Sequence, residues 1–404
     1  MEASGTNVSF RHDRIINSDF VKLFLGFHFF MLNLSIFNLL PHYLELRGTT
    51  EALYGAIAGT MGVASVTGII LLGHRADHWS RKSTVVFYMG LGLIGNVVAI
   101  LAMQLPVEYY FISRAAQGLA LALGLPIVFA WALETCPEDK KQEVMAWIGI
   151  AGLVANSLGP LIAEFIMTQF PVGKGAGAYY WVFIVAMGLQ TTSFGFFLLT
   201  RNSRAYTDDS ATTSFFGILF RSHSSLVLVV MLLFGGIFGV FISFGKNYAV
   251  SVDLSYVSVL FSAYTVGAVL SRVFITPVTK LLTPRHMIAA GFVGVGLSLW
   301  MLIFVENYWE LGFLGAFYGF SHGVLYPTLI VRFIEAQKAT EIGRSTILIQ
   351  GAFSGGWGLF PYLGGVVLEF SNFPTLFSLL TAIAGLGILL HLWSDKRLSR
   401  SNPF

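Results

Sequence analysis

The chain contains 404 residues, of which 55% are hydrophobic and only 11% are charged. Because soluble globular proteins carry about 25% charged residues, this chain has too few ionic groups to cover a water-exposed surface. The composition therefore excludes a water-soluble fold and predicts an all-α membrane protein, and the small net charge of +3 gives no reason to expect a nucleic-acid partner.

Long apolar runs separated by short polar breaks predict twelve membrane-spanning helices, because one span needs about 20 apolar residues. The predicted spans are 20–44, 51–72, 83–105, 107–135, 142–169, 179–200, 224–249, 255–279, 287–305, 309–334, 345–368 and 372–394. The polar residues before the first span lack the features of a cleavable signal peptide, so we expect that span to be retained.

The longest polar interruption, 201–223, divides the chain near its midpoint. It predicts two six-helix halves, 1–200 and 224–404, joined by a cytoplasmic linker. The layout repeats at an offset near 204, so that Phe20 and Ser224 begin corresponding spans. Doubled halves of this kind are typical of transporters whose site lies between the repeats.

Basic residues are distributed unevenly between the two sides that these spans define. With the N-terminus placed in the cytoplasm, most of the 24 Lys and Arg residues are cytoplasmic, and only Arg47, Lys174 and Lys246 fall on the other side. Arg114 and Arg272 lie within predicted spans. Cytoplasmic loops carry an excess of Lys and Arg, so we expect both termini to be cytoplasmic.

The loop after the second span combines, in chain order, Gly73, Asp77, Arg81 and Lys82. An acid at a helix end accepts hydrogen bonds from the N-terminus of a neighbouring helix, so this cluster is a candidate latch between conformations. The stretch resembles the signature loop G-x-x-x-D-R-x-G-R-R of the major facilitator superfamily, with His78 and Ser80 replacing its usual Arg and Gly. An ordinary basic loop is the alternative.

The resemblance implies the major facilitator fold, with two pseudo-symmetric six-helix halves that rock about a cavity lined by spans 1, 4, 7 and 10. Within the superfamily the chain resembles bacterial efflux-type members, which implies a multi-pass protein of the bacterial inner membrane. One chain already contains both halves, so we expect a monomer.

The fourth span contains Arg114, Gln117 and Gly118. An arginine within a span costs about 2.5–3.5 kcal/mol on insertion scales and usually faces a cavity or an acid. The stretch resembles the superfamily motif R-x-x-Q-G, which is common in proton-coupled drug antiporters. A cavity role suits an anionic or zwitterionic solute, whereas the alternative is that Arg114 extends to the lipid headgroups.

The fifth span contains Gly159 and Pro160, a step that kinks a helix and permits close packing. It is followed by Ala163 and Glu164, where the exporter motif G-P-x-x-G-G has two glycines. This departure weakens the antiporter assignment. Glu164 is either a proton-binding acid or, as we expect, a residue at the outer membrane interface.

The tenth span places His322 near the middle of the membrane, with Tyr318 and Tyr326 one turn to either side. A histidine at that depth either carries a proton or packs between helices in its neutral form. Further polar and aromatic candidates for the cavity are His28, Asn33, Asn38, Gln350 and Trp357.

No phosphate-binding glycine loop, metal-ligand spacing or nucleophile triad is visible in the sequence. We therefore predict no cofactor and no enzyme activity, but gradient-driven transport of a small organic solute, with proton-coupled efflux favoured. The alternatives are proton-coupled uptake of a metabolite or sugar and, more remotely, a membrane sensor that transports nothing.

Overall fold

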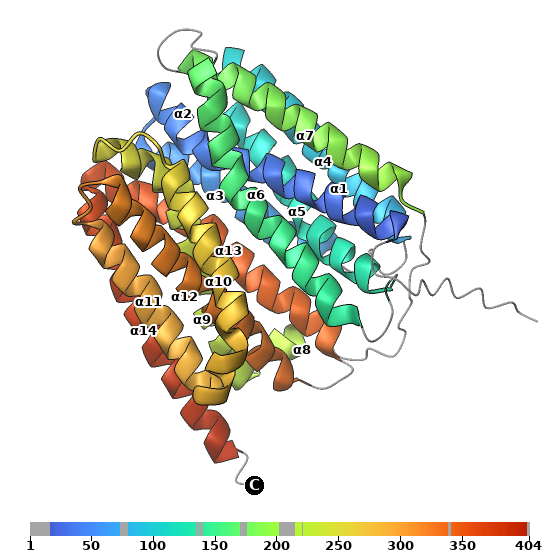
Figure 1. The fold of residues 1–404 in the computed structure, drawn as a ribbon, viewed down its shortest axis with the longest axis vertical. Coiled ribbons are helices and arrows are strands. Elements are labelled where there is room, and N and C mark those ends of the chain that lie inside the picture. The colour runs from blue at the N-terminus through green and yellow to red at the C-terminus, as the bar shows by residue number, and fades with distance from the viewer. Residues whose placement is uncertain are drawn as a thin grey trace, which may run out of the picture.

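The computed structural model describes residues 17–72, 80–134, 136, 140–169, 176–201, 215–219, 221–337 and 341–401. Within these ranges the chain is helical and contains no strand, as predicted (Figure 1). The helices are α1 (Ser18–Ile36), η1 (Phe37–Leu39), α2 (Leu40–Leu46), α3 (Glu51–Leu72), α4 (Arg81–Leu101), η3 (Ala102–Gln104), α5 (Tyr109–Glu134), α6 (Lys141–Gln169), η5 (Ala176–Ala178), α7 (Tyr179–Leu199), α8 (Phe215–Leu219), α9 (Ser222–Ser251), α10 (Ser258–Leu281), α11 (Pro284–Leu302), α12 (Tyr308–Glu335), α13 (Ile342–Phe370) and α14 (Phe373–Ser401).

Each predicted span corresponds to one of these helices, and the first is a continuous run through α1, η1 and α2. Among the described residues, ten helices are long and apolar enough to cross a membrane. The other two are α10, which contains a shorter apolar stretch at Ser258–Phe274, and α13. Membrane crossing by α10 and α13 remains a prediction.

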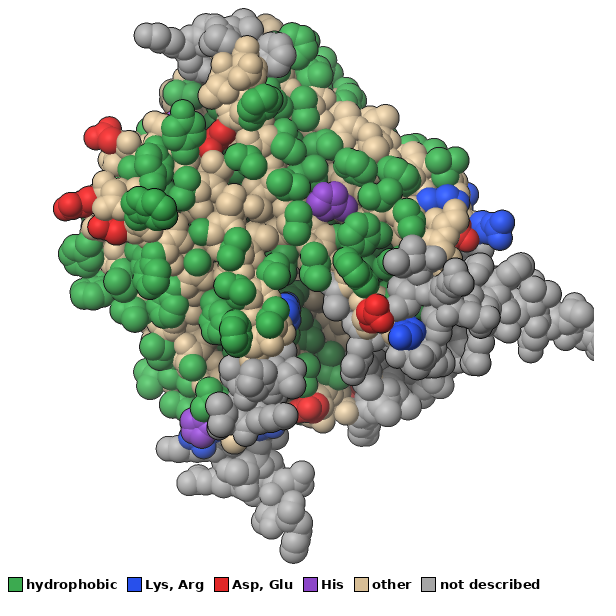
Figure 2. Space-filling model, viewed as in Figure 1, with side chains coloured by type: hydrophobic (Ala, Val, Ile, Leu, Met, Phe, Trp, Pro, Cys, Tyr) green, Lys and Arg blue, Asp and Glu red, His purple; other side chains and the backbone are tan. Residues whose placement is uncertain are grey.

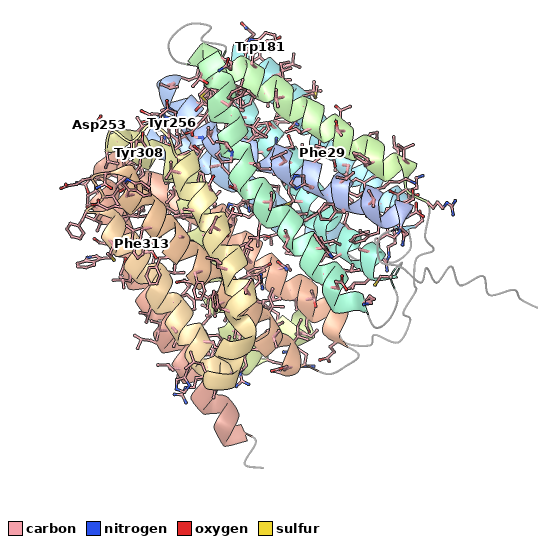
Figure 3. The ribbon with its side chains drawn as sticks, in the orientation of Figure 1. Phe29, Trp181, Asp253, Tyr256, Tyr308 and Phe313 are labelled. Carbon is pink, nitrogen blue, oxygen red and sulfur yellow. The ribbon has the colours of Figure 1, made fainter. Side chains whose placement is uncertain are left out.

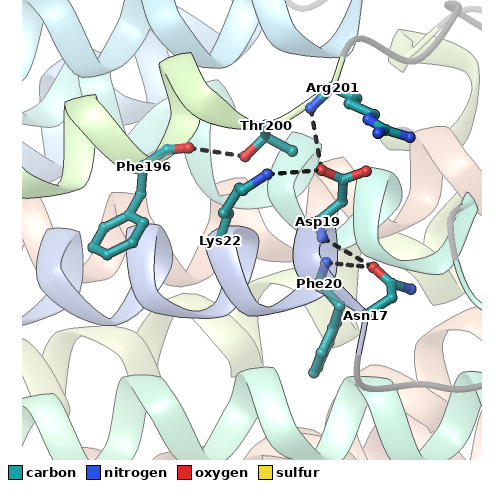
Figure 4. A network of polar contacts seen from close by, with 7 residues as sticks. All are labelled: Asn17, Asp19, Phe20, Lys22, Phe196, Thr200 and Arg201. Carbon is teal, nitrogen blue, oxygen red and sulfur yellow. Dashed lines mark hydrogen bonds and ion pairs between the residues drawn. The ribbon is translucent and has the colours of Figure 1, made fainter.

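Local sequence sets the start of α1. The side chain of Asn17 accepts hydrogen bonds from the backbone N–H groups of Asp19 and Phe20, at 3.0 and 2.9 Å (Figure 4). An Asn at this position satisfies N–H groups that have no partner within the helix. Asp19 also accepts from Lys22 Nζ and from the backbone N–H of Arg201, so the start of α1 is joined to the end of α7.

The helices form two groups in Figure 1. α1 packs against α6 and α7, and α5 packs against α3 and α4; in the other group α12 packs against α10 and α11, while α14 packs against α9 and α11. The groups meet where α3 lies along α13 and α6 lies along α10. We call the end where α2, α6, α9 and α13 stop the Glu164 end, after the residue near the end of α6.

Glycines allow α3 and α13 to touch backbone to backbone. A Cβ added at Gly59 would lie 2.0 Å from the Gly358 carbonyl oxygen, and one at Gly62 would lie 2.3 Å from the Gly358 nitrogen. A Cβ at Gly55 would meet the Pro361 carbonyl oxygen at 2.3 Å. Larger residues would force these two helices apart.

The exterior is apolar, as a lipid-facing surface requires. Hydrophobic side chains cover most of the centre of the face in Figure 2, and large ones such as Phe313 are well exposed. Exposed aromatic residues lie towards the Glu164 end, where Figure 3 labels Trp181 and, beside the loop residue Asp253, Tyr256 with the half-buried Tyr308. Trp and Tyr are enriched at membrane–water boundaries, so these side chains fit an interfacial position.

Candidate functional site

A chain of five polar side chains crosses the interior of the first half. Arg114 Nη1 donates to Gln117 Oε1 at 2.6 Å, and Gln117 Nε2 donates to Asn96 Oδ1 at 2.8 Å. Asn96 Nδ2 donates to Asn33 Oδ1 at 2.7 Å, and Asn33 Nδ2 donates to Gln190 Oε1 at 3.0 Å. None of these side chains is more than 5% exposed. We call them the polar chain of the first half.

The polar chain ends at Gln190, which is held by a backbone hydrogen bond. Gln190 Nε2 donates to the Met89 backbone carbonyl at 3.0 Å, and Asn96 Nδ2 also donates to the Ala186 carbonyl at 3.2 Å. Each amide in the chain therefore both donates and accepts, which keeps buried polar groups satisfied in an apolar bundle. Four helices, α1, α4, α5 and α7, contribute to this one network.

Arg114 is the charged member of the polar chain. Its guanidinium lies over the Phe37 ring at 5.9 Å from the centroid, and within the described residues its Nε has no partner and no carboxylate forms an ion pair with it. It lies about one turn inside α5 and is directed into the bundle rather than towards the headgroups. A cation buried among neutral groups can accommodate an anion.

The remaining candidates on the first span lie apart from the polar chain. His28 is half-buried and its Nδ1 donates to the Ala151 carbonyl at 2.9 Å, which links α1 to α6. Asn38 is buried in η1, and its Nδ2 has no partner within the described residues. Of the three residues predicted on this span, Asn33 alone is hydrogen-bonded to Gln190 and Asn96.

The second half contains an aromatic cluster in place of an amide network. His322 Nδ1 is hydrogen-bonded to the Tyr264 hydroxyl at 3.1 Å. The His322 ring stacks on Phe238 with centroids 4.7 Å apart, and it contacts Phe234 and Tyr326 at 5.1 and 5.8 Å. We call these five residues the aromatic cluster of the second half. Within the described part of the chain, the buried Nε2 of His322 has no hydrogen-bond partner.

The other predicted residues of the second half border the aromatic cluster. Tyr326 donates from its hydroxyl to Gln350 Oε1 at 2.8 Å. Tyr318 is fully buried and stacks on Phe241 with centroids 4.0 Å apart. Trp357 lies 6.0 Å from Phe238 between ring centroids and packs against core residues of both halves.

Near its end, α6 forms a buried ion pair with the second half. Glu164 Oε1 accepts from Lys246 Nζ at 2.8 Å, and both side chains are less than a tenth exposed. The same carboxylate accepts from the backbone N–H groups of Val257 and Ser258 at 2.8 and 3.1 Å, where α10 begins. Glu164 is therefore buried, and its charge is satisfied inside the protein, while its expected depth at the outer membrane interface stays a prediction.

The predicted latch falls only partly within the described residues. Gly73 and Asp77 lie outside them, whereas Arg81 and Lys82 form the first turn of α4 and are half-buried. Pro160 lies inside α6, and the preceding Gly159 packs closely on α1, since a Cβ there would lie 1.8 Å from the Ser35 hydroxyl oxygen.

Several residues of these clusters were not predicted from the sequence. Asn96 and Gln190 belong to spans that the resemblance does not place at the cavity, yet each is an amide within an apolar run, a signal that is visible in the sequence. Tyr264 and Phe238 carried no such signal, because aromatic residues in a span usually face lipid or core. For Lys246 the sequence predicts only a charge on the outer side.

No described group of three or more His, Cys, Asp or Glu side chains is arranged to hold a metal ion. A groove of about 270 Å³ lies between α3, α5 and α13, but its lining is apolar and includes none of the predicted site residues. Among the described residues, the polar chain offers a buried cation and the aromatic cluster offers buried ring faces.

Comparison with known proteins agrees with this architecture. The family model described as Major Facilitator Superfamily matches residues 23–258 and 226–403. The staphylopine export protein of Staphylococcus aureus is 21% identical over 324 residues, which cover 77% of this chain and 79% of that protein. A mutant of the nucleoside transporter NupG superimposes with a TM-score of 0.78 at 16% identity, over 94% of this chain and 100% of that one.

The POT family transporter PepTSo superimposes with a TM-score of 0.77 at 11% identity, over 95% of this chain and 99% of that one. Identities this low establish a shared fold only. The family model, in contrast, covers nearly the whole length. The chain is therefore a multi-pass membrane transporter that belongs to the Major Facilitator Superfamily.

Proposed function

We propose that this transporter moves a small organic anion or zwitterion by alternating access and couples its movement to protons, with efflux as the favoured direction. In this proposal the halves 1–200 and 224–404 rock about the region between the polar chain and the aromatic cluster. The chain acts as a monomer in a bacterial inner membrane with both termini in the cytoplasm, and it catalyses no covalent reaction.

The observation that carries the proposal is the environment of Arg114. Burying a cation costs several kcal/mol unless a counter-charge is supplied, and the polar partner of its Nη1 is the neutral Gln117. An anionic group on the solute would supply that counter-charge and form charge-assisted hydrogen bonds. The Nε with no partner in the described part of the chain offers one donor for it.

Efflux is favoured by two further points. The staphylopine export protein aligns over most of both chains, and the fourth-helix stretch resembles the motif of proton-coupled antiporters. Ala163 and Glu164 depart from the exporter motif of the fifth helix, so direction requires a direct test. Uptake with the same residues is the competing direction.

The solute class can be tested in proteoliposomes that contain a trapped pH-sensitive dye. The probes are an aromatic carboxylate, an aromatic amino acid, an aromatic amine and a neutral sugar. We expect proton flux with the carboxylate or the amino acid, and a loss of about tenfold or more in Arg114→Ala, because a charge-assisted hydrogen bond contributes about 1.5–3 kcal/mol. Lys140 is an exposed cation that directly precedes α6. Lys140→Gln is therefore the matched control and should keep wild-type flux.

The same vesicles, with movement of the solute measured beside the dye signal, separate the two roles of His322. If His322 carries the proton, His322→Ala moves solute without proton flux; if it only packs, coupling is retained. Flux driven equally by the amine and the sugar, with Arg114→Ala unaffected, would contradict the proposed solute class. Vesicles of known orientation then distinguish efflux from uptake through the sign of the pH change.

A further inference from the structure

Glu164 occupies an unusual position for an acid in a membrane protein. It is 6% exposed and forms three hydrogen bonds through its carboxylate, with Lys246 Nζ and with two backbone N–H groups at the start of α10. The start of a helix carries partial positive charge. Every one of these partners is a hydrogen-bond donor that faces the carboxylate.

These contacts join the two halves, because Glu164 belongs to α6 and its partners belong to the chain after the linker. Two neutral hydrogen bonds continue the same α6–α10 contact deeper in the bundle. Ser157 donates to the Ser262 hydroxyl at 3.1 Å, and the Thr265 hydroxyl donates to the Leu153 carbonyl at 3.0 Å. Separation of the halves at the Glu164 end must break all of these contacts, and the carboxylate is the acid among them.

Glu341 provides an internal comparison. Within the described residues it is the other buried carboxylate, and it pairs with Arg221 through two hydrogen bonds of 2.7 and 2.8 Å. Arg221 directly precedes α9 and Glu341 directly precedes α13, and both helices belong to the second half, so movement between the halves does not separate them. Glu164 differs because its partners move away when the halves part.

We propose that Glu164 is a proton-binding site, and that its protonation from the outer side releases α6 from α9 and α10. This inference rests on the proposed alternating movement of the two halves. A proton from outer water binds the carboxylate and neutralises it, while Lys246 keeps its own proton and becomes hydrated as the Glu164 end opens. Closure returns the proton and restores the ion pair.

Other titratable groups face this region and must be separated from Glu164. Lys246 of α9 is its direct partner, and Tyr179 of α7 lies close enough to interact electrostatically with it. On α2, Glu45 accepts from Asn247 Nδ2 at 2.7 Å, which is also a contact between the halves, and His42 lies 3.2 Å from the same carboxylate oxygen. The His42–Glu45 pair is thus the rival pH sensor.

The test measures opening directly in the full chain. Cys136, the one cysteine of the sequence, is replaced by Ser, and spin labels are attached at Gln169→Cys on α6 and Ser251→Cys on α9, both exposed positions. Distances between the labels are recorded in lipid nanodiscs from pH 8 to pH 4, a range that extends into that of carboxyl groups. We expect the closed-to-open ratio to fall at the acidic end of this range by up to about tenfold per pH unit, the limit for one proton.

The variants locate the proton. Glu164→Gln should populate the open distance at every pH, with less than about a twofold change across the range. Glu310→Gln removes an exposed acid at the same end whose contacts stay within the second half, and it should behave like wild type. His42→Asn and Glu45→Gln should retain the pH response. Loss of the response in either of these, or its survival in Glu164→Gln, overturns the proposal.

A second variant tests the proposal even if Glu164→Gln fails to fold. Lys246→Met removes the positive partner, so Glu164 should bind its proton more readily and the midpoint for opening should move to higher pH. An unmoved midpoint contradicts the proposal. The distance measurement needs no solute, so failure of this site and failure of the proposed efflux are distinguishable.

Discussion

The two halves of this transporter keep different chemistry in their interiors. The polar chain of the first half links four helices through amides and a single cation, whereas the aromatic cluster of the second half surrounds one histidine with rings. An amide network holds its members by directional bonds, while ring contacts tolerate small shifts. The contrast suggests that the first half supplies a fixed charge and the second supplies an adaptable surface.

The largest loss of stability is expected where a glycine that packs against another helix is enlarged. Such substitutions test how closely the helices of each region approach one another. A Cβ at Gly319 would lie 2.0 Å from the Tyr264 backbone oxygen, whereas the nearest atom to one at Gly95, beside Gln117, is 2.9 Å away. We expect Gly319→Ala to cost about 3 kcal/mol of stability and Gly95→Ala about 1 kcal/mol, within the range for overpacking. Thermal unfolding in detergent measures both, and equal costs would remove this difference between the regions.

The next effect concerns the hydrogen bonds themselves. Asn96→Ala removes the middle of the polar chain and leaves groups of Gln117 and Asn33 without their partner, at a cost of about 1–3 kcal/mol. Tyr264→Phe removes one hydrogen bond to His322 and keeps the ring, so about 0.6 kcal/mol is expected, the average for such bonds between membrane helices. The same unfolding measurement applies. A larger cost for Tyr264→Phe would mean that the histidine, and not the rings, organises the aromatic cluster.

The smallest effect on stability is expected for the ion pair between Arg221 and Glu341, which lies outside the polar chain and the aromatic cluster. It serves as the reference for the effects in those two regions. The hydrogen bonds from Arg221 to Glu341 raise the pKa of Arg221 above its ordinary value, so this guanidinium stays charged at any pH that the protein tolerates. Arg221→Lys keeps the charge but loses the two-pronged contact, and its half-exposed position limits the cost to about 0.5 kcal/mol. Unfolding at pH 6 and pH 9 should show the same small difference.

The sequence predicts the fold well because each span is a local property. Hydrophobic length and polar breaks place the predicted spans within a few residues, apart from the end of α14, which continues to Ser401. The short α8 lies within the predicted linker. The family motif adds Arg114 and Gln117, whose spacing already puts them on one face. Tertiary pairing is not local, so the partners Asn96 and Gln190, far apart in sequence, follow only from the packing of α4 and α7.

Glu164 shows why burial is the hardest property to predict. Its position near the end of an apolar run is compatible with a headgroup contact, and nothing in its neighbourhood names Lys246 as a partner. The pairing depends on how α6 of one half meets α9 of the other, which sequence spacing within either helix does not encode. His322 is itself a visible polar residue in its span, but its neighbours Phe234 and Phe238 come from the stretch 226–242 of α9, which has no polar side chain.

The contact between α3 and α13 has a consequence for the speed of any movement between the halves. Side chains that interlock must change rotamer before two helices can part, and each such side chain loses conformational entropy when it locks again. Gly59, Gly62 and Gly358 have no rotamers to reset. The backbones of α3 and α13 can therefore separate and meet again in the same packing arrangement on every cycle.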